Sequence, residues 1–112
     1  MELQLIDIGH ASKIALQGRL DTPGVDQIET RFTASVVPAA RNTLVDLSDV
    51  SFVSSMGIRM LISTARSLSL KKAKMVLFGA QPLVKESLDH VSLGDIIPMV
   101  TSEAQAIELL RS

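Results

Sequence analysis

The sequence contains no cysteine, no tryptophan and no tyrosine, and each absence narrows what the chain can do. Without cysteine there can be no disulfide, no thiolate metal site and no thiol nucleophile, which fits a reducing compartment. The chain has only three phenylalanines, so it lacks the aromatic platforms on which proteins stack single-stranded bases. A folded core must therefore be built mostly from Leu, Ile, Val, Ala and Met.

An excess of charge of one sign and long apolar runs are also missing. Eleven basic residues balance twelve acidic ones, for a net charge of -1, so there is no basic footprint and we expect no nucleic-acid partner. No apolar run approaches the roughly 20 residues that span a bilayer. The acidic start "MELQLIDIGHASK" does not resemble a signal peptide. We therefore expect a cytoplasmic protein without membrane association.

What the chain does have is a high apolar fraction, 46% of its 112 residues. This is typical of a folded chain, and the length suits one domain. No linker, repeat or low-complexity stretch divides the chain, so we predict a single domain over residues 1–112.

The first third of the chain changes from a period of two to a period near 3.6. The ranges Leu3–Ile8 and Lys13–Gly18 alternate as short strands around a turn, which predicts a hairpin. Asp21 or Thr22 can then cap a helix with Pro23 at its first position. This helix should end near Pro38 and have the inner face Val25, Ile28, Phe32 and Val36.

Strands and helices alternate through the remainder of the chain. Predicted strands are Thr43–Leu47, Ala73–Ala80 and Asp95–Val100, the last at an edge because of Pro98. The helices between them should bury Ile58, Leu61, Ile62, Ala65 and Leu68, and then Leu83, Ser87, Leu88 and Val91. A final helix, capped by Thr101 or Ser102, should bury Ala104, Ile107 and Leu110, with Leu109 at the margin. The order ββαβαβαβα predicts an α/β fold: a mixed sheet of about five strands with four helices.

The residues for catalysis or cofactor binding do not assemble into a known pattern. A nucleophilic serine needs a base, but His10 lies in the predicted hairpin turn and His90 late in the third helix. No G-x-S-x-G, phosphate-binding loop or cluster of metal ligands is present. We expect no enzyme activity, no cofactor and no metal.

The stretch "FVSSMGIRML" (Phe52–Leu61) holds the candidate site. Ser54 suits the N-cap of the helix that follows, where a serine stabilises by roughly 1 kcal/mol. Ser55 lies at the helix start, where free N–H groups and the positive end of the dipole favour an anion. A phosphate on Ser55 would leave the fold intact and change the surface that a partner contacts. On local chemistry alone both serines can also be structural.

The stretch "LVDLSDVSFVSSMGIRMLI" resembles the signature of the STAS domain, and the whole chain resembles single-domain anti-sigma factor antagonists. "LQGRLDT" resembles the G-x-L-D turn of that family, here with Gly18, Leu20 and Asp21. The resemblance implies a single STAS domain that switches partners. Its unphosphorylated form would bind a serine kinase/anti-sigma factor of the histidine-kinase-like ATPase type, and a metal-dependent serine phosphatase would reverse the phosphorylation.

By position, the resemblance places the phosphoacceptor on Ser55, with Ser54 as the second choice. Ser54 stands where the family commonly has aspartate, and Met56 where it has serine or threonine. Arg59 can compensate by reaching a phosphate on Ser55. Gly57 would give a partner close access to Ser55. The alternatives are a STAS scaffold or sensor-binding module that is not phosphorylated, and a protein that binds a small ligand or nucleotide. The implied partner surface consists of Asp21, Thr22, Ser54, Ser55, Met56, Gly57 and Arg59.

Overall fold

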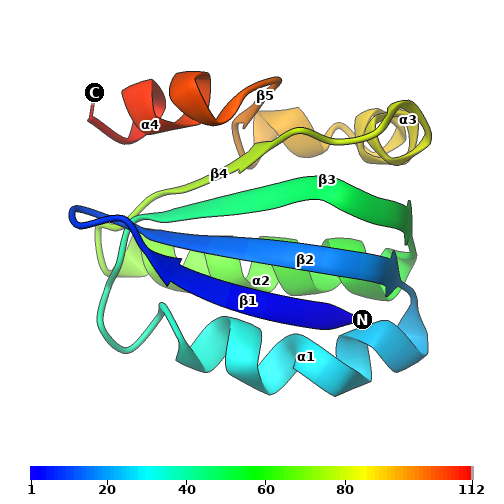
Figure 1. The fold of residues 1–112 in the computed structure, drawn as a ribbon, viewed down its shortest axis with the longest axis horizontal. Coiled ribbons are helices and arrows are strands. Elements are labelled where there is room, and N and C mark those ends of the chain that lie inside the picture. The colour runs from blue at the N-terminus through cyan, green and yellow to red at the C-terminus, as the bar shows by residue number, and fades with distance from the viewer. Residues whose placement is uncertain (112) are drawn as a thin grey trace.

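The computed structural model describes residues 1–111, which form one α/β domain around a five-stranded sheet (Figure 1). The predicted order ββαβαβαβα is confirmed, with one additional short 3-10 helix, η1, before the last strand. The elements are β1 (Glu2–Asp7), β2 (Ser12–Leu20), α1 (Thr22–Ala34), β3 (Thr43–Val53), α2 (Ser55–Leu70), β4 (Met75–Phe78), α3 (Pro82–His90), η1 (Leu93–Asp95), β5 (Met99–Val100) and α4 (Glu103–Arg111).

The strands lie in the sheet in chain order, β1-β2-β3-β4-β5. The predicted hairpin is confirmed, since β1 pairs antiparallel with β2, and every later pair is parallel. Parallel neighbours need crossover connections, and α1, α2 and α3 supply them. The carboxyl ends of β2 and β3 therefore lie side by side, and each strand leads directly into the start of a helix. This edge of the sheet carries the candidate site.

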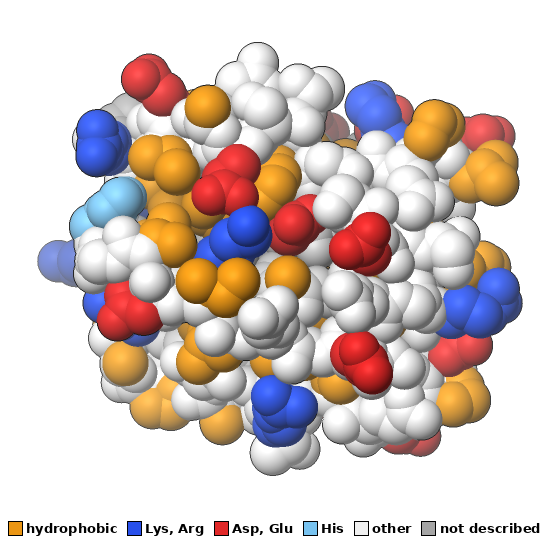
Figure 2. Space-filling model, viewed as in Figure 1, with side chains coloured by type: hydrophobic (Ala, Val, Ile, Leu, Met, Phe, Trp, Pro, Cys, Tyr) orange, Lys and Arg blue, Asp and Glu red, His pale blue; other side chains and the backbone are white. Residues whose placement is uncertain are grey.

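Two apolar clusters cover the two faces of the sheet. The larger one joins one face to α1, α2 and α3, and Phe32, Leu61 and Leu88 lie at its centre with almost no exposed surface. The smaller one packs Leu44 and Phe78 of the opposite face against α4. In Figure 1, α2 passes behind β1 and β2, and α1 lies below β1; the two helices contact each other. No helix lies in front of β1 and β2 in Figure 1, and Figure 2, drawn from the same side, shows acidic and basic side chains intermixed on this face of the molecule.

Strand β3 is longer than its apolar spacing predicts and continues to Val53. Beyond Leu47 its buried residues, Val50 and Val53, come at steps of three. The cause is a pair of register shifts against β2, which interrupt the period of two. Because of this extension, β3 ends directly before the helix cap at Ser54.

Two predicted helix faces are partly wrong: Leu88 of α3 and Leu110 of α4 are buried as predicted, but other members of each face are not. In α3 the buried residues are Val84 and Leu88, whereas Leu83 and Val91 are exposed. In α4 they are Ala106 and Leu110, and Ala104 is exposed. Both helices are short, so a pattern of two or three apolar residues does not fix the helix phase.

Smaller differences concern the ends of two elements and the buried face of α2. Thr22 is the first residue of α1 and Pro23 the second, with Asp21 as the N-cap. In α2, Met60 and Thr64 are buried, while Ile58 and Ile62 are only half-buried. The last strand is confirmed at the sheet edge but spans only Met99–Val100, because η1 occupies the start of its predicted range.

Candidate functional site

The candidate site lies where α2 begins, directly after β3. Ser54 is the N-cap, as predicted: its Oγ accepts a hydrogen bond from the backbone N–H of Gly57 at 3.2 Å. The same Oγ donates to the carbonyl oxygen of Leu20 at 3.0 Å, and the Ser54 backbone N–H donates to that oxygen at 2.9 Å. Ser54 therefore both caps α2 and joins it to the end of β2.

Ser55 differs from Ser54 in every one of these respects. It is the first residue of α2, its side chain is exposed, and its hydroxyl makes no hydrogen bond to any residue in the range 1–111. The backbone N–H groups of the first helical turn and the positive end of the helix dipole lie beside it. The structure thus places a free hydroxyl where a negative charge is favoured.

The prediction that Gly57 gives a partner access to Ser55 is wrong. Gly57 is buried, and a Cβ atom on it would lie 2.8 Å from both the carbonyl oxygen and the Cγ atom of Leu20. The absence of a side chain therefore lets the first turn of α2 approach the end of β2. Gly57 positions the site from beneath and is not part of its surface.

Asp21 caps the neighbouring helix α1 and joins the same edge of the sheet. One of its carboxylate oxygens accepts from the backbone N–H of Gly24 at 2.9 Å, and the other pairs with the Arg19 Nε atom at 3.3 Å. The Gly24 hydrogen bond, assisted by Arg19, holds the pKa of Asp21 below its ordinary value, although desolvation acts in the opposite direction. Asp21 follows Leu20 directly, so the starts of α1 and α2 are adjacent.

Exposed apolar side chains surround Ser55. Phe52 and Met56 are 40% and 37% exposed. The Arg19 guanidinium lies 4.4 Å from the centroid of the Phe52 ring, a cation–π contact that holds Phe52 at the surface. Among the remaining predicted residues, Thr22 and Arg59 are exposed, and Arg59 has no ion pair within the described chain.

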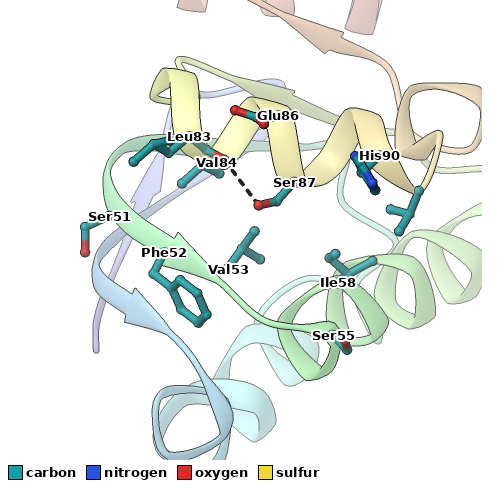
Figure 3. A pocket seen from close by; sticks show the side chains of 11 residues that line it. Ser51, Phe52, Val53, Ser55, Ile58, Leu83, Val84, Glu86, Ser87 and His90 are labelled. Carbon is teal, nitrogen blue, oxygen red and sulfur yellow. Dashed lines mark hydrogen bonds between the residues drawn. The ribbon is translucent and has the colours of Figure 1, made fainter.

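A groove of about 520 Å³ separates the start of α2 from α3. In Figure 3, Phe52, Ser55 and Ile58 lie on one side of it, and Ser87 and His90 of α3 lie on the other. The prediction of the site did not include α3, because Leu83 was assigned to the core. The signal in the sequence that identifies α3 as a wall of the groove is Leu83, an apolar residue that lies outside the buried stripe formed by Val84 and Leu88.

The other candidate residues, for catalysis or metal binding, form no such site within residues 1–111. His10 lies exposed in the hairpin turn, far along the chain from His90 at the end of α3. Within residues 1–111 no three His, Cys, Asp or Glu side chains are grouped so that they could hold a metal ion. No helix in this range is long and apolar enough to cross a membrane.

Comparison with known proteins identifies the family to which the chain belongs. Residues 3–106 match the STAS domain family, and the chain is therefore a member of that family. BtrV of Bordetella bronchiseptica, a candidate anti-sigma factor antagonist, is 26% identical over 106 residues, covering 95% of this chain and 91% of BtrV.

Solved structures agree with this membership at the level of the fold. A candidate anti-sigma factor antagonist of Thermotoga maritima superposes with a TM-score of 0.90 at 14% identity, covering 98% of this chain and 95% of that one. The anti-sigma factor antagonist SpoIIAA in its unphosphorylated form gives 0.81 at 23% identity, covering 98% and 96%. Bacillus SpoIIAA in its phosphorylated form gives 0.73 at 22% identity, covering 98% and 100%.

Proposed function

We propose that this STAS domain is a partner-switching regulator of the anti-sigma factor antagonist type, controlled by reversible phosphorylation of Ser55. Its unphosphorylated form binds a serine kinase/anti-sigma factor of the histidine-kinase-like ATPase type. That kinase phosphorylates Ser55 and is released, and a metal-dependent serine phosphatase restores the binding form. The observation that carries the proposal is the contrast between the two serines: the Ser54 hydroxyl is engaged, and the Ser55 hydroxyl is exposed and unbonded.

The position of Ser55 makes a phosphate compatible with the fold. A phosphate there adds nearly two negative charges at the start of α2, where the helix dipole stabilises them. Arg59 lies one turn further along the same helix and can pair with the phosphate. On Ser54, by contrast, a phosphate would replace the hydroxyl proton that is donated to the Leu20 carbonyl oxygen and place a doubly charged group on a half-buried residue.

The same modification would change the surface that the partner contacts. Phe52 and Met56 are exposed apolar groups of the kind that a partner buries in an interface. A doubly charged group beside them must lose its hydration when the interface forms, which disfavours binding. The chain can therefore release its partner without unfolding.

Incubation with the serine kinases of the same genome and ATP tests the proposal, with mass spectrometry to locate the phosphate. We expect modification of Ser55, its loss in Ser55→Ala, and its retention in Ser54→Ala. In a binding assay with the kinase, Ser55→Asp should keep the wild-type circular dichroism spectrum and bind more weakly.

The main competing function is a STAS scaffold that binds partners without being phosphorylated. The serine at position 54 favours it, because the resemblance implies that the family commonly has aspartate there, and a kinase that reads this acid would find none. Tight binding to one kinase with no phosphate on Ser55 would establish the scaffold and eliminate the switch. Unchanged affinity of Ser55→Asp would also contradict the switch.

A further inference from the structure

The outer face of α2 is a second surface that begins at Ser55. A shallow groove of about 500 Å³ follows this face from Ser55 to Leu70. Its apolar floor is formed by Ile58 and Ile62, which are half-buried, and its far end by Leu70, which is 87% exposed. At 1.5 Å per residue, the distance from Ile58 to Leu70 is about 18 Å, the length of a short helical segment. Ser55 and Ile58 line both this groove and the one beside α3.

The charges on this face have one sign. Arg59 and Arg66 are the charged residues of the groove, both are exposed, and neither forms an ion pair with another residue of the described chain. The whole stretch from Val50 to Lys85 contains six basic residues and no acidic one, although the chain has a net charge of -1. A surface with an apolar floor and unpaired arginines complements an acidic amphipathic segment.

We propose that the outer face of α2 binds an acidic amphipathic helix of a partner protein, with its apolar residues on Ile58, Ile62 and Leu70 and its carboxylates on Arg59 and Arg66. Nucleic acid is disfavoured because it offers phosphates but no apolar stripe for this floor. The proposal rests on the proposed function in one respect: Ser55 lies at one end of the groove, so its phosphate repels an acidic partner. This gives phosphorylation an electrostatic means of releasing that partner.

A designed peptide tests the surface without the natural partner. The probe is a 16-residue amphipathic peptide with a leucine stripe and glutamate elsewhere, and its control is the same peptide with lysine for glutamate. Fluorescence anisotropy measures affinity, and amide chemical shifts in ¹H–¹⁵N spectra locate the contact. We expect the glutamate peptide to bind with shifts confined to α2, and affinity to fall as salt is raised. The lysine peptide should not bind.

Charge reversals identify the residues responsible. Arg59→Glu and Arg66→Glu should each weaken the glutamate peptide about fivefold or more, since each replaces an attraction by a repulsion. Arg111→Glu makes the same change of net charge on α4 and should leave affinity unchanged. Equal weakening by Arg111→Glu, equal binding of both peptides, or shifts outside α2 would overturn the proposal. So would tighter binding, through the same arginines, of a 16-nucleotide single-stranded DNA or of vesicles containing phosphatidylserine.

The proposed switch and this docking face can fail separately. If no kinase modifies Ser55 but the glutamate peptide binds α2, the docking face stands and the switch fails. If Ser55 is phosphorylated but the peptide does not bind, the switch stands and the docking face fails. Ser55→Asp should weaken the peptide as well, by about twofold or more, because it places one negative charge at the end of the groove.

Discussion

The two serines at the start of α2 are expected to contribute very differently to stability. Ser54→Ala removes an N-cap acceptor from the Gly57 N–H, which costs about 1 kcal/mol in comparable helices. It also removes the Oγ–H bond to the Leu20 carbonyl oxygen. That oxygen keeps the bond from the Ser54 backbone N–H, so the additional loss is about 0.5 kcal/mol. The free energy of unfolding should therefore fall by about 1–2 kcal/mol.

Urea denaturation followed by circular dichroism measures this difference. For a domain of this size a loss of 1–2 kcal/mol corresponds to a lower urea midpoint by on the order of 0.5–1 M, with an unchanged slope. Ser55→Ala is the matched control, because its hydroxyl has no partner in the described chain, and it should stay within about 0.5 kcal/mol of wild type. Ser54→Thr, which keeps a hydroxyl, should recover most of the loss.

The result that refutes this reasoning is equal behaviour of the two alanine variants. If Ser55→Ala costs as much as Ser54→Ala, the Ser55 hydroxyl is engaged in solution and is not free for modification. If Ser54→Ala costs nothing, Ser54 does not join α2 to the end of β2.

Three further changes test the packing and the charge around the site. Gly57→Ala places a Cβ atom 2.8 Å from the end of β2 and should lower the free energy of unfolding by about 1–3 kcal/mol. Gly94→Ala is the control and should not lower it, because the space around Gly94 is open. Equal urea midpoints of the two variants would refute the close approach of Gly57 to β2. Asp21→Asn keeps a capping side chain, but its free energy of unfolding should fall less steeply than that of the wild type as the pH drops below 3.8. The reason is that a carboxyl whose pKa is lowered in the folded state stabilises the fold at pH values above its unfolded-state pKa, and this contribution is lost as the carboxyl is protonated. An unchanged pH profile of the urea midpoint would contradict the pKa shift. Leu88→Ala should cost about 2–5 kcal/mol and Leu83→Ala less than 1, and the reverse order would place α3 in the other phase.

Alternation of strand and helix patterns was sufficient to predict the sheet, because parallel pairing and crossover connections leave few arrangements for this order. The cap at Ser54 was also predictable, since it depends on a local backbone bond three residues away. The carboxyl ends of β2 and β3 meet through long-range pairing, yet the element order already implies it. Features that follow from local chemistry or from topology could therefore be predicted from the sequence.

Features that depend on the exact packing of side chains could not be predicted from the sequence. The extra residues in β3 break its period of two, so Val50 and Val53 could not be read as strand residues. The role of Gly57 depends on how closely Leu20 approaches it, which no spacing in the sequence records. The wall formed by α3 was missed because Leu83 and Val84 are both apolar, and only the packed helix decides which is buried.

Under the proposed function, the serine at position 54 gives the switch a particular electrostatic character. Its hydroxyl donates to the Leu20 carbonyl oxygen, which a carboxylate at this position could not do. The start of α2 therefore carries no fixed negative side chain before modification, and Arg59 and Arg66 have no ion pair in the described chain. A phosphate on Ser55 then adds nearly two negative charges one turn from Arg59, which carries one positive charge, so this end of the groove becomes net negative. A partner that depends on acidic contacts with these arginines loses its attraction at that step, and higher salt should weaken the same complex before any phosphate is added.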